Sequence, residues 1–365
     1  MASQFKVVLF EDDPQIGPEV EKAIRRNLPR ELSLLRFPLD AGPKSKGPYE
    51  DCITQVLRAA LFANTVLLVT DRDLSASNWP GLSEAAVTRV GQKLGYPVAW
   101  YAQRAAPEYE IMTRIPGDGR IGLPNTVVEL AREAAVIAKG FVDLQNRLTR
   151  HHGQARRGQR PRSPGELLAA LLGEPAAASH LDAYACGDQL VVAEILKRGS
   201  ASTDGGASSD HRRLVAALGV WIVDVVLRYP GVLLGEIAAA SYLDIDPPEF
   251  ARPEIRNVFR SALWSGAPFV DSEKPRWWKI RLDDLLAKNG VELGAELVAK
   301  RRKRQPRFCP CHVDPTLHAG YFCMVTKKPV SAENSVGPIT WFPPGAELAR
   351  ITRNIFDKVA PWVGR

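Results

Sequence analysis

The chain of 365 residues is long enough for two or three domains, each with a hydrophobic core of its own. Hydrophobic residues make up 45% of it and charged residues 24%, as in an ordinary soluble globular protein. No apolar run approaches the roughly 20 residues of a membrane helix, and the sequence MASQFKVVLFEDD lacks the basic and apolar regions of a secretory signal. We therefore expect a cytoplasmic protein that has no membrane partner.

Residues 1–148 alternate between strand and helix patterns. Strands are expected at Lys6–Phe10, Glu31–Phe37, Thr65–Thr70, Tyr96–Tyr101 and Gly119–Leu123, and helices at Ile16–Asn27, Tyr49–Phe62, Ser83–Leu94 and Asn125–Leu148. The first and third strands are continuous apolar runs, which is typical of parallel strands that are buried on both faces. The alternation predicts an α/β domain in which helices cover a doubly wound, five-stranded parallel sheet.

The remainder of the chain predicts three further parts. Residues 149–164 are polar, basic and interrupted by prolines, so we expect an inter-domain linker. Residues 165–300 are mainly helical in pattern, and three helices followed by a strand-like alternation at Trp277–Leu282 are the order of a winged-helix domain. Residues 301–365 are rich in Cys, His, Pro and Gly and close on an amphipathic helix, Ala346–Val359, which predicts a loop-rich module.

Two basic runs stand out in a chain whose formal net charge is +7. They supply seven candidate nucleic-acid contacts: Arg156, Arg157, Arg160, Arg301, Arg302, Lys303 and Arg304. Lysine and arginine side chains bind phosphates and make such binding dependent on salt. The alternative is that both runs are solvated linkers between domains.

Acidic residues follow two of the predicted strands. Glu11, Asp12 and Asp13 come directly after the first strand, and Asp71 and Asp73 follow the third. In open α/β sheets the carboxyl ends of the strands form the ligand site. Carboxylates gathered there repel one another and favour a hard cation such as Mg²⁺. Glu11, Asp12 and Asp71 are therefore the candidate Mg²⁺ ligands, and the alternative is a solvated acidic turn.

These motifs resemble the receiver domain of bacterial response regulators. The stretch LFEDDP with its following helix is close to the first-strand signature of that family, and Asp71 directly follows VLLVT at the place of its phosphate acceptor. The resemblance covers residues 1–148. It implies a flavodoxin-like strand order, a Mg²⁺-binding acid pair, a histidine kinase as partner and Asp71 as the phosphorylated residue, with Asp73 as second choice.

Two positions depart from the family pattern. The family has a Ser or Thr after the fourth strand and a Lys before a Pro after the fifth, where this chain has Tyr101 and Leu123. The lysine would neutralise an incoming phosphoryl oxygen, and leucine carries no charge. The resemblance therefore implies a degenerate receiver, or pseudo-receiver, and leaves open a fold that serves only for dimerisation or docking.

Five cysteines, an odd number in a chain expected to be cytoplasmic, argue against a disulfide framework. Three of them lie within the stretch FCPCHVDPTLHAGYFCM, which offers five candidate zinc ligands: Cys309, Cys311, His312, His318 and Cys323. Thiolates and imidazoles suit a structural Zn²⁺, although Cys309 and Cys311 are closer than in a standard zinc finger. Buried free cysteines and a catalytic thiol or metal are the alternatives.

Three functions follow from these features. The first is a bacterial regulatory protein, in which a receiver-like domain meets a kinase or another protein and the C-terminal half acts through protein contacts or DNA. The second is a Mg²⁺-dependent phosphoester hydrolase or nuclease-type effector, although no motif such as a P-loop or GxSxG supports it. The third is a non-enzymatic subunit of a stress or phage-defence complex. Whether the chain also forms a homodimer stays open.

Overall fold

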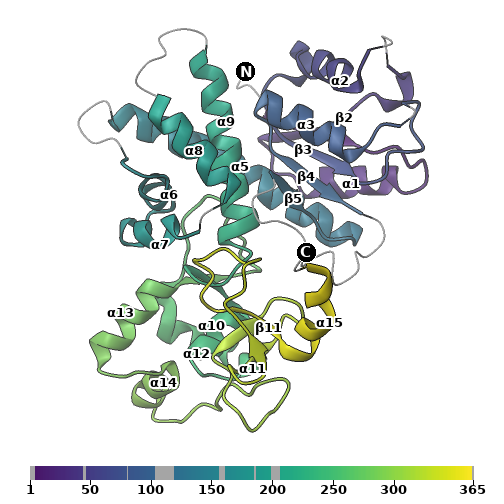
Figure 1. The fold of residues 1–365 in the computed structure, drawn as a ribbon. Coiled ribbons are helices and arrows are strands. Elements are labelled where there is room, and N and C mark those ends of the chain that lie inside the picture. The colour runs from purple at the N-terminus through teal and green to yellow at the C-terminus, as the bar shows by residue number, and fades with distance from the viewer. Residues whose placement is uncertain are drawn as a thin grey trace.

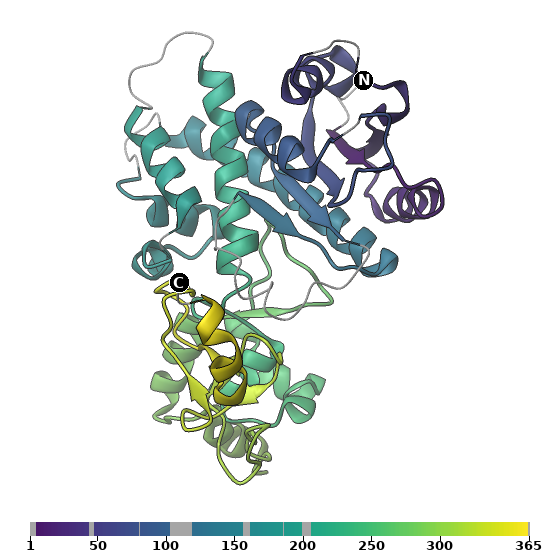
Figure 2. The same ribbon diagram turned by 45° about the vertical axis from the view of Figure 1, so that its right-hand side comes forward.

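A computed structural model of the chain describes residues 5–43, 47–79, 81–102, 119–155, 161–184, 186–198 and 206–363. The chain forms two parts that lie one above the other (Figure 1). The parallel sheet and a group of long helices share the upper part, and the segments from β6 onward make up the lower part. Turning the molecule by 45° leaves this division in place (Figure 2).

The upper part contains the predicted five-stranded parallel sheet. Its strands are β1 (Phe5–Phe10), β2 (Leu32–Arg36), β3 (Thr65–Asp71), β4 (Val98–Tyr101) and β5 (Arg120–Gly122). They pair in the order β2-β1-β3-β4-β5, and every pair is parallel. This is the flavodoxin-like order of doubly wound folds. The α/β class and the strand order expected from the sequence are thus confirmed.

Helices cover both faces of this sheet. They are α1 (Gly17–Asn27), α2 (Tyr49–Leu57), α3 (Glu84–Leu94) and α5 (Val127–Ala155), with short 3-10 turns η1 (Leu39–Ala41) and η2 (Ala60–Phe62). Because side chains of a strand alternate between faces, Val7 and Leu9 join the core beside α1 and α5, whereas Val8 and Phe10 join the core beside α2 and α3.

Helix α5 is longer than the sequence pattern indicated. It runs past Leu148 to Ala155, into the segment that we expected to be a linker. A second group of helices follows: α6 (Pro164–Leu172), η3 (Pro175–Ala177), α7 (Ala178–Asp182), α8 (Gly187–Arg198), α9 (Gly206–Val220) and the π-helical segment η4 (Trp221–Val226).

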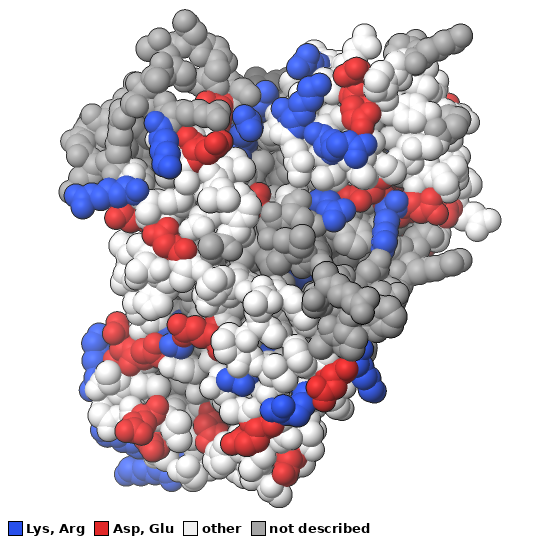
Figure 3. Space-filling view, in the orientation of Figure 1, with Lys and Arg blue, Asp and Glu red and all other residues white. Residues whose placement is uncertain are grey.

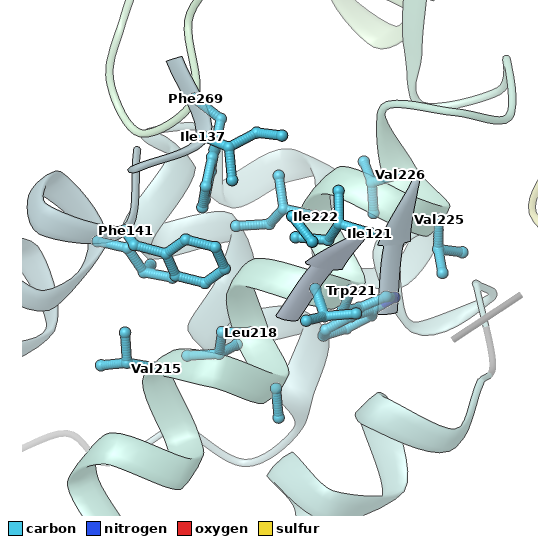
Figure 4. Packing of buried hydrophobic residues seen from close by; sticks show 14 of the residues in the cluster. Ile121, Ile137, Phe141, Val215, Leu218, Trp221, Ile222, Val225, Val226 and Phe269 are labelled. Carbon is cyan, nitrogen blue, oxygen red and sulfur yellow. The ribbon is translucent and has the colours of Figure 1, made fainter. Parts of the chain in front are cut away.

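The sheet and this second helical group share one hydrophobic core. Figure 4 shows Ile121 of β5 and Phe141 of α5 packed with Leu218 of α9 and Trp221 of η4. The helices approach closely because Gly219 faces Phe141: a Cβ atom on this glycine would lie 2.0 Å from the ring. The boundaries that we drew at residues 148 and 164 stay predictions, and this shared core extends across both.

The lower part begins with a short strand. Its elements are β6 (Leu233–Gly235), α10 (Glu236–Tyr242), α11 (Pro247–Phe250), α12 (Pro253–Arg256), η5 (Asn257–Ala262), β7 (Arg276–Trp278), α13 (Lys279–Asn289) and α14 (Gly294–Arg302). Strands β6 and β7 pair antiparallel, although α10, α11, α12 and η5 lie between them in the sequence. The expected hairpin after three helices is therefore absent from residues 233–302, because the segment after Trp278 continues as a helix.

The last residues form a small mixed sheet. Strands β8 (Tyr321–Cys323), β9 (Pro329–Val330), β10 (Ser335–Val336) and β11 (Ala349–Thr352) pair in the order β10-β11-β8-β9, and helix α15 (Arg353–Val363) follows. The helix predicted at Ala346–Val359 is wrong in its first half. Its apolar spacing comes from a buried strand, β11, that is joined directly to a helix.

Candidate functional site

The carboxyl edge of the parallel sheet brings together residues from four strands. Glu11 follows β1, and Asp71 and Tyr101 are the last residues of β3 and β4 and partners in their register. Leu123 follows β5, and its N–H donates to the carbonyl oxygen of Trp100 at 2.8 Å. The structure thus places Glu11, Asp71, Tyr101 and Leu123 at one edge of the sheet.

Glu11 is the centre of this edge. Its side chain is 0% exposed and takes two hydrogen bonds, one from the Tyr101 hydroxyl to Oε2 and one from the N–H of Asp13 to Oε1 at 2.8 Å. Burial raises the pKa of the Glu11 carboxyl, and these two donors offset only part of that effect. Gly17, the first residue of α1, lies close to this side chain. A Cβ atom at this position would lie 3.0 Å from Glu11 Cγ.

Asp71 is buried beside Glu11. It is 3% exposed, and it accepts a hydrogen bond from the N–H of Asp73 at 3.3 Å. Burial, followed by the negative charges of Glu11 and Asp12, raises the pKa of Asp71 to about 7. The pKa of Tyr101 is also raised, first by burial and then by Glu11, so its hydroxyl stays protonated as a donor.

The other acids have different surroundings. Asp12 is half-buried, with a pKa raised mainly by burial, and its Oδ2 is a buried atom without a hydrogen bond to the described residues. Asp13 Oδ1 accepts from the N–H groups of Gln15 at 2.7 Å and Ile16 at 3.1 Å, which organises the turn into α1. Asp73 is exposed and caps the N–H of Ser75 at 3.0 Å.

Two further described residues lie near the buried acids. Leu123 packs its side chain against the core, and Arg36 uses Nη2 to bind the main-chain oxygen of Glu11 at 3.0 Å. No group of three His, Cys, Asp or Glu residues in the described ranges is arranged to hold a metal ion. Both oxygens of Glu11 accept hydrogen bonds, whereas Asp12 Oδ2 is buried without one among the described residues, and the Mg²⁺ site stays a prediction.

The three clustered cysteines are all fully buried as free thiols. Burial raises the pKa of Cys309 to about 12. Burial also disfavours the Cys323 thiolate, but hydrogen bonds from Thr326 and Thr352 outweigh it and lower the net pKa; backbone donors such as the N–H of Asp314 do the same for Cys311. Two of the three sulfur atoms therefore lie where a thiolate is stabilised.

The two candidate histidines point to different partners. His312 bonds the carbonyl oxygen of Pro329 through Nδ1 at 2.6 Å, and its Nε2 lies 3.5 Å from the hydroxyls of Thr326 and Thr352. His318 instead pairs with Asp244 at 2.8 Å. The sequence did not indicate Thr326, Thr352 or Asp244 as site residues. Only the folded chain brings them close to the two histidines.

The zinc prediction therefore stays a prediction. Cys311 and Cys323 lie in one small cluster, but His318 is engaged elsewhere and no described trio of ligands forms. Metal analysis of the purified chain is the direct test, since a structural zinc would give about one ion per molecule.

The basic run 300–307, which begins in the last turn of α14, is exposed but largely occupied by contacts within the chain. Arg302 donates to the carbonyl oxygen of Glu254 at 2.8 Å, Arg301 to that of Val258 at 3.3 Å, and Arg304 pairs with the buried Glu249 at 3.1 Å. Lys303 ends the helix at φ 56°. The three other candidates, Arg156, Arg157 and Arg160, lie outside the described residues.

The described surface in the view of Figure 3 shows acidic and basic side chains interspersed, with no broad area of one sign. Among the described helices, none combines the length and the apolar character required to cross a bilayer.

Comparison of the sequence with protein-family models and with curated proteins gave no match.

Proposed function

We propose that the protein is regulatory and that its sheet domain acts as a pseudo-receiver, a receiver-like module that recognises a protein partner without accepting a phosphoryl group. The observation that carries this proposal is the hydrogen bond from Tyr101 to Glu11. It links the ends of β4 and β1 at the position where the phosphorylation chemistry of the resembling family takes place.

The surroundings of Asp71 support the absence of phosphoryl transfer. A carboxylate nucleophile must be ionised and accessible, whereas Asp71 is 3% exposed and its pKa is raised to about 7. Leu123 supplies no charge for a developing phosphoryl oxygen. Phosphotransfer would require the Tyr101 side chain to move and a cation to enter.

The partner in this proposal is another protein, either a kinase-like sensor or a subunit of a larger complex. The sheet and helices α6–α9 share one hydrophobic core. This supports a role in transmitting a signal, because a partner that shifts the sheet domain on binding also shifts these helices. The output of residues 233–363 through DNA remains a separate proposal, which rests on the basic run 300–307 alone.

Exposure to acetyl phosphate and to beryllofluoride, each with Mg²⁺, tests the central claim. We expect no covalent mass increase of one phosphoryl group in the intact protein and no beryllofluoride-dependent rise in melting temperature. The Asp71→Asn variant is the matched control, since it keeps the side-chain volume and removes the acceptor. Stoichiometric labelling of the native chain that disappears in Asp71→Asn would overturn the proposal.

A partner-binding role needs its own readout. Affinity capture from the source cells with the native chain, followed by the same capture with a Tyr101→Ala variant, asks whether the closed acidic edge matters for recognition. A specific protein that is retained by the first and depleted with the second supports the proposal.

A further inference from the structure

An open cavity of about 310 Å³ lies in the lower part, away from the acidic edge. The beginning of α10 and strand β6 form one wall, the segment before β7 forms a second, and the turn after β8 forms a third. Its lining combines apolar side chains, among them Leu233, Ile237 and Phe322, with several charged ones. This size is at the lower end of the range for small-molecule pockets.

Four cations line the cavity against two carboxylates. The cations are Arg228, Lys274, Arg276 and Lys327, and the carboxylates are Glu236 and Glu273. Both carboxylates bind arginines that are not part of the lining: Glu236 pairs with Arg256, and Glu273 pairs with Arg132 at 2.9 Å. The acids of the cavity therefore neutralise charges outside it.

Two of the four cations also have partners elsewhere. Arg228 pairs with the buried Asp224 at 3.1 Å, and Lys274 pairs with Glu133 at 2.7 Å. Arg276 and Lys327 differ, because neither forms an ion pair with any carboxylate of the described residues. Glu133 and Asp271 are near enough to favour the charge of Arg276, but Asp271 pairs with Arg132 at 2.8 Å.

The position of Lys327 is fixed by its turn. Its N–H donates to the carbonyl oxygen of Cys323 at 2.9 Å, and its backbone takes a left-handed conformation at φ 56°, which non-glycine residues adopt rarely. The Nζ atom lies 5.9 Å from the centre of the Phe322 ring. Arg276 is held by the pairing of β7 with Gly235 of β6.

We propose that this cavity binds a small phosphorylated organic compound, with its phosphate between Arg276 and Lys327 and its organic part against Ile237, Leu233 and Phe322. A guanidinium matches phosphate oxygens in a two-pronged geometry, and a lysine ammonium adds a point charge. Neither cation is paired with a carboxylate of the described residues, so both charges attract an anion that enters between them. This proposal is independent of the pseudo-receiver function.

Isothermal titration of the full chain at low salt tests the proposal with adenosine 5′-monophosphate as the probe, adenosine as the control without phosphate, and inorganic phosphate as competitor. Lys327→Gln should weaken binding of the nucleotide by about tenfold or more, the usual effect of losing one charge-assisted hydrogen bond. Lys328→Gln is the matched control, because it removes the same charge from the adjacent residue, which does not line the cavity.

A second variant leaves all the cations in place. Ile237→Glu adds a carboxylate to the cavity wall in the first turn of α10, where acidic residues suit a helix, so the fold should persist. We expect it to abolish nucleotide binding. Binding of adenosine as tight as that of the nucleotide, no binding of either phosphate probe at millimolar concentration, or equal affinity in Lys327→Gln and Lys328→Gln would each overturn the proposal.

Discussion

The Tyr101 hydroxyl donates a hydrogen bond to the carboxylate of Glu11, 90 positions earlier in the chain. This contact joins the carboxyl ends of β4 and β1 and leaves Glu11 with a partner on each oxygen. A buried carboxyl needs such donors, because an unpaired polar group in a protein interior costs free energy. Tyr101 thus supplies Glu11 Oε2 with a neutral hydroxyl donor.

Tyr101→Phe removes this hydroxyl and keeps the ring. We expect the free energy of unfolding to fall by about 1–3 kcal/mol, because Glu11 is 0% exposed and loses one of its two hydrogen-bond donors. Urea denaturation followed by circular dichroism measures the change. Tyr96→Phe is the matched control, since the hydroxyl of Tyr96 makes no hydrogen bond to the described residues. A loss of the same size in both variants would contradict the role given to Tyr101.

Asp71→Asn should stabilise the protein at neutral pH. The pKa of Asp71 is raised from 3.8 to about 7 in the folded state, so its stabilising contribution is complete below pH 4 and is lost as the pH rises through 7. Asparagine keeps the acceptor for the Asp73 N–H and cannot ionise. We expect the variant to gain on the order of 1–3 kcal/mol above pH 7 and nothing below pH 4, from urea denaturation in the presence of a chelator.

The difference between the two pH profiles isolates Asp71 from the other carboxylates. Asp73→Asn serves as the control, because Asp73 is exposed and should change the stability much less than Asp71→Asn does as the pH rises. A gain in Asp71→Asn that does not change with pH would show that the side chain acts by packing and not by its charge.

The sheet and its acidic edge could be predicted from the sequence for a physical reason. Buried parallel strands need apolar residues on both faces, so Val7–Phe10 and Val66–Val69 stand out as continuous runs. The topology then places whatever follows those strands at one edge, which brings Asp71 and Tyr101 together. The hydrogen bond from Tyr101 to Glu11 could not be predicted, because it depends on side-chain orientation.

The C-terminal half was harder to predict because its contacts are set by folding over long distances in the sequence. Ligand types in the stretch 309–323 suggested zinc, yet His318 turns to Asp244, and the same aspartate accepts the N–H of Cys309. Short strands such as β11 have too few residues to show a period that differs from a helix. Composition therefore indicated which groups were present but not which of them meet.

Gly219→Ala should separate α9 from α5. Replacing a glycine inside a helix by alanine normally raises the free energy of unfolding by about 1 kcal/mol. Here, however, the new Cβ atom would lie 2.0 Å from the packed Phe141 ring. We expect a net loss of about 1–2 kcal/mol from overpacking, measured by urea denaturation. Gly266→Ala is the control, since the nearest atom to its added Cβ is Arg147 Nη2 at 3.7 Å. A more stable Gly219→Ala variant would show that the two helices do not pack as described.

Nucleotide binding to the cavity should depend on pH through Lys327. Surrounding protein and the nearby charge of Arg228 lower the pKa of Lys327 to about 8, and only its protonated form attracts a phosphate. Affinity should therefore hold between pH 6.5 and 7.5 and fall as the pH rises above 8, by up to about tenfold per pH unit. The other charged groups that line the cavity are Arg228, Glu236, Glu273, Lys274 and Arg276. Titration of adenosine 5′-monophosphate across this range measures the effect, and Lys327→Gln should bind weakly with a flat profile. A profile that falls equally in Lys327→Gln would assign the titrating group elsewhere and contradict the contact between this lysine and the phosphate.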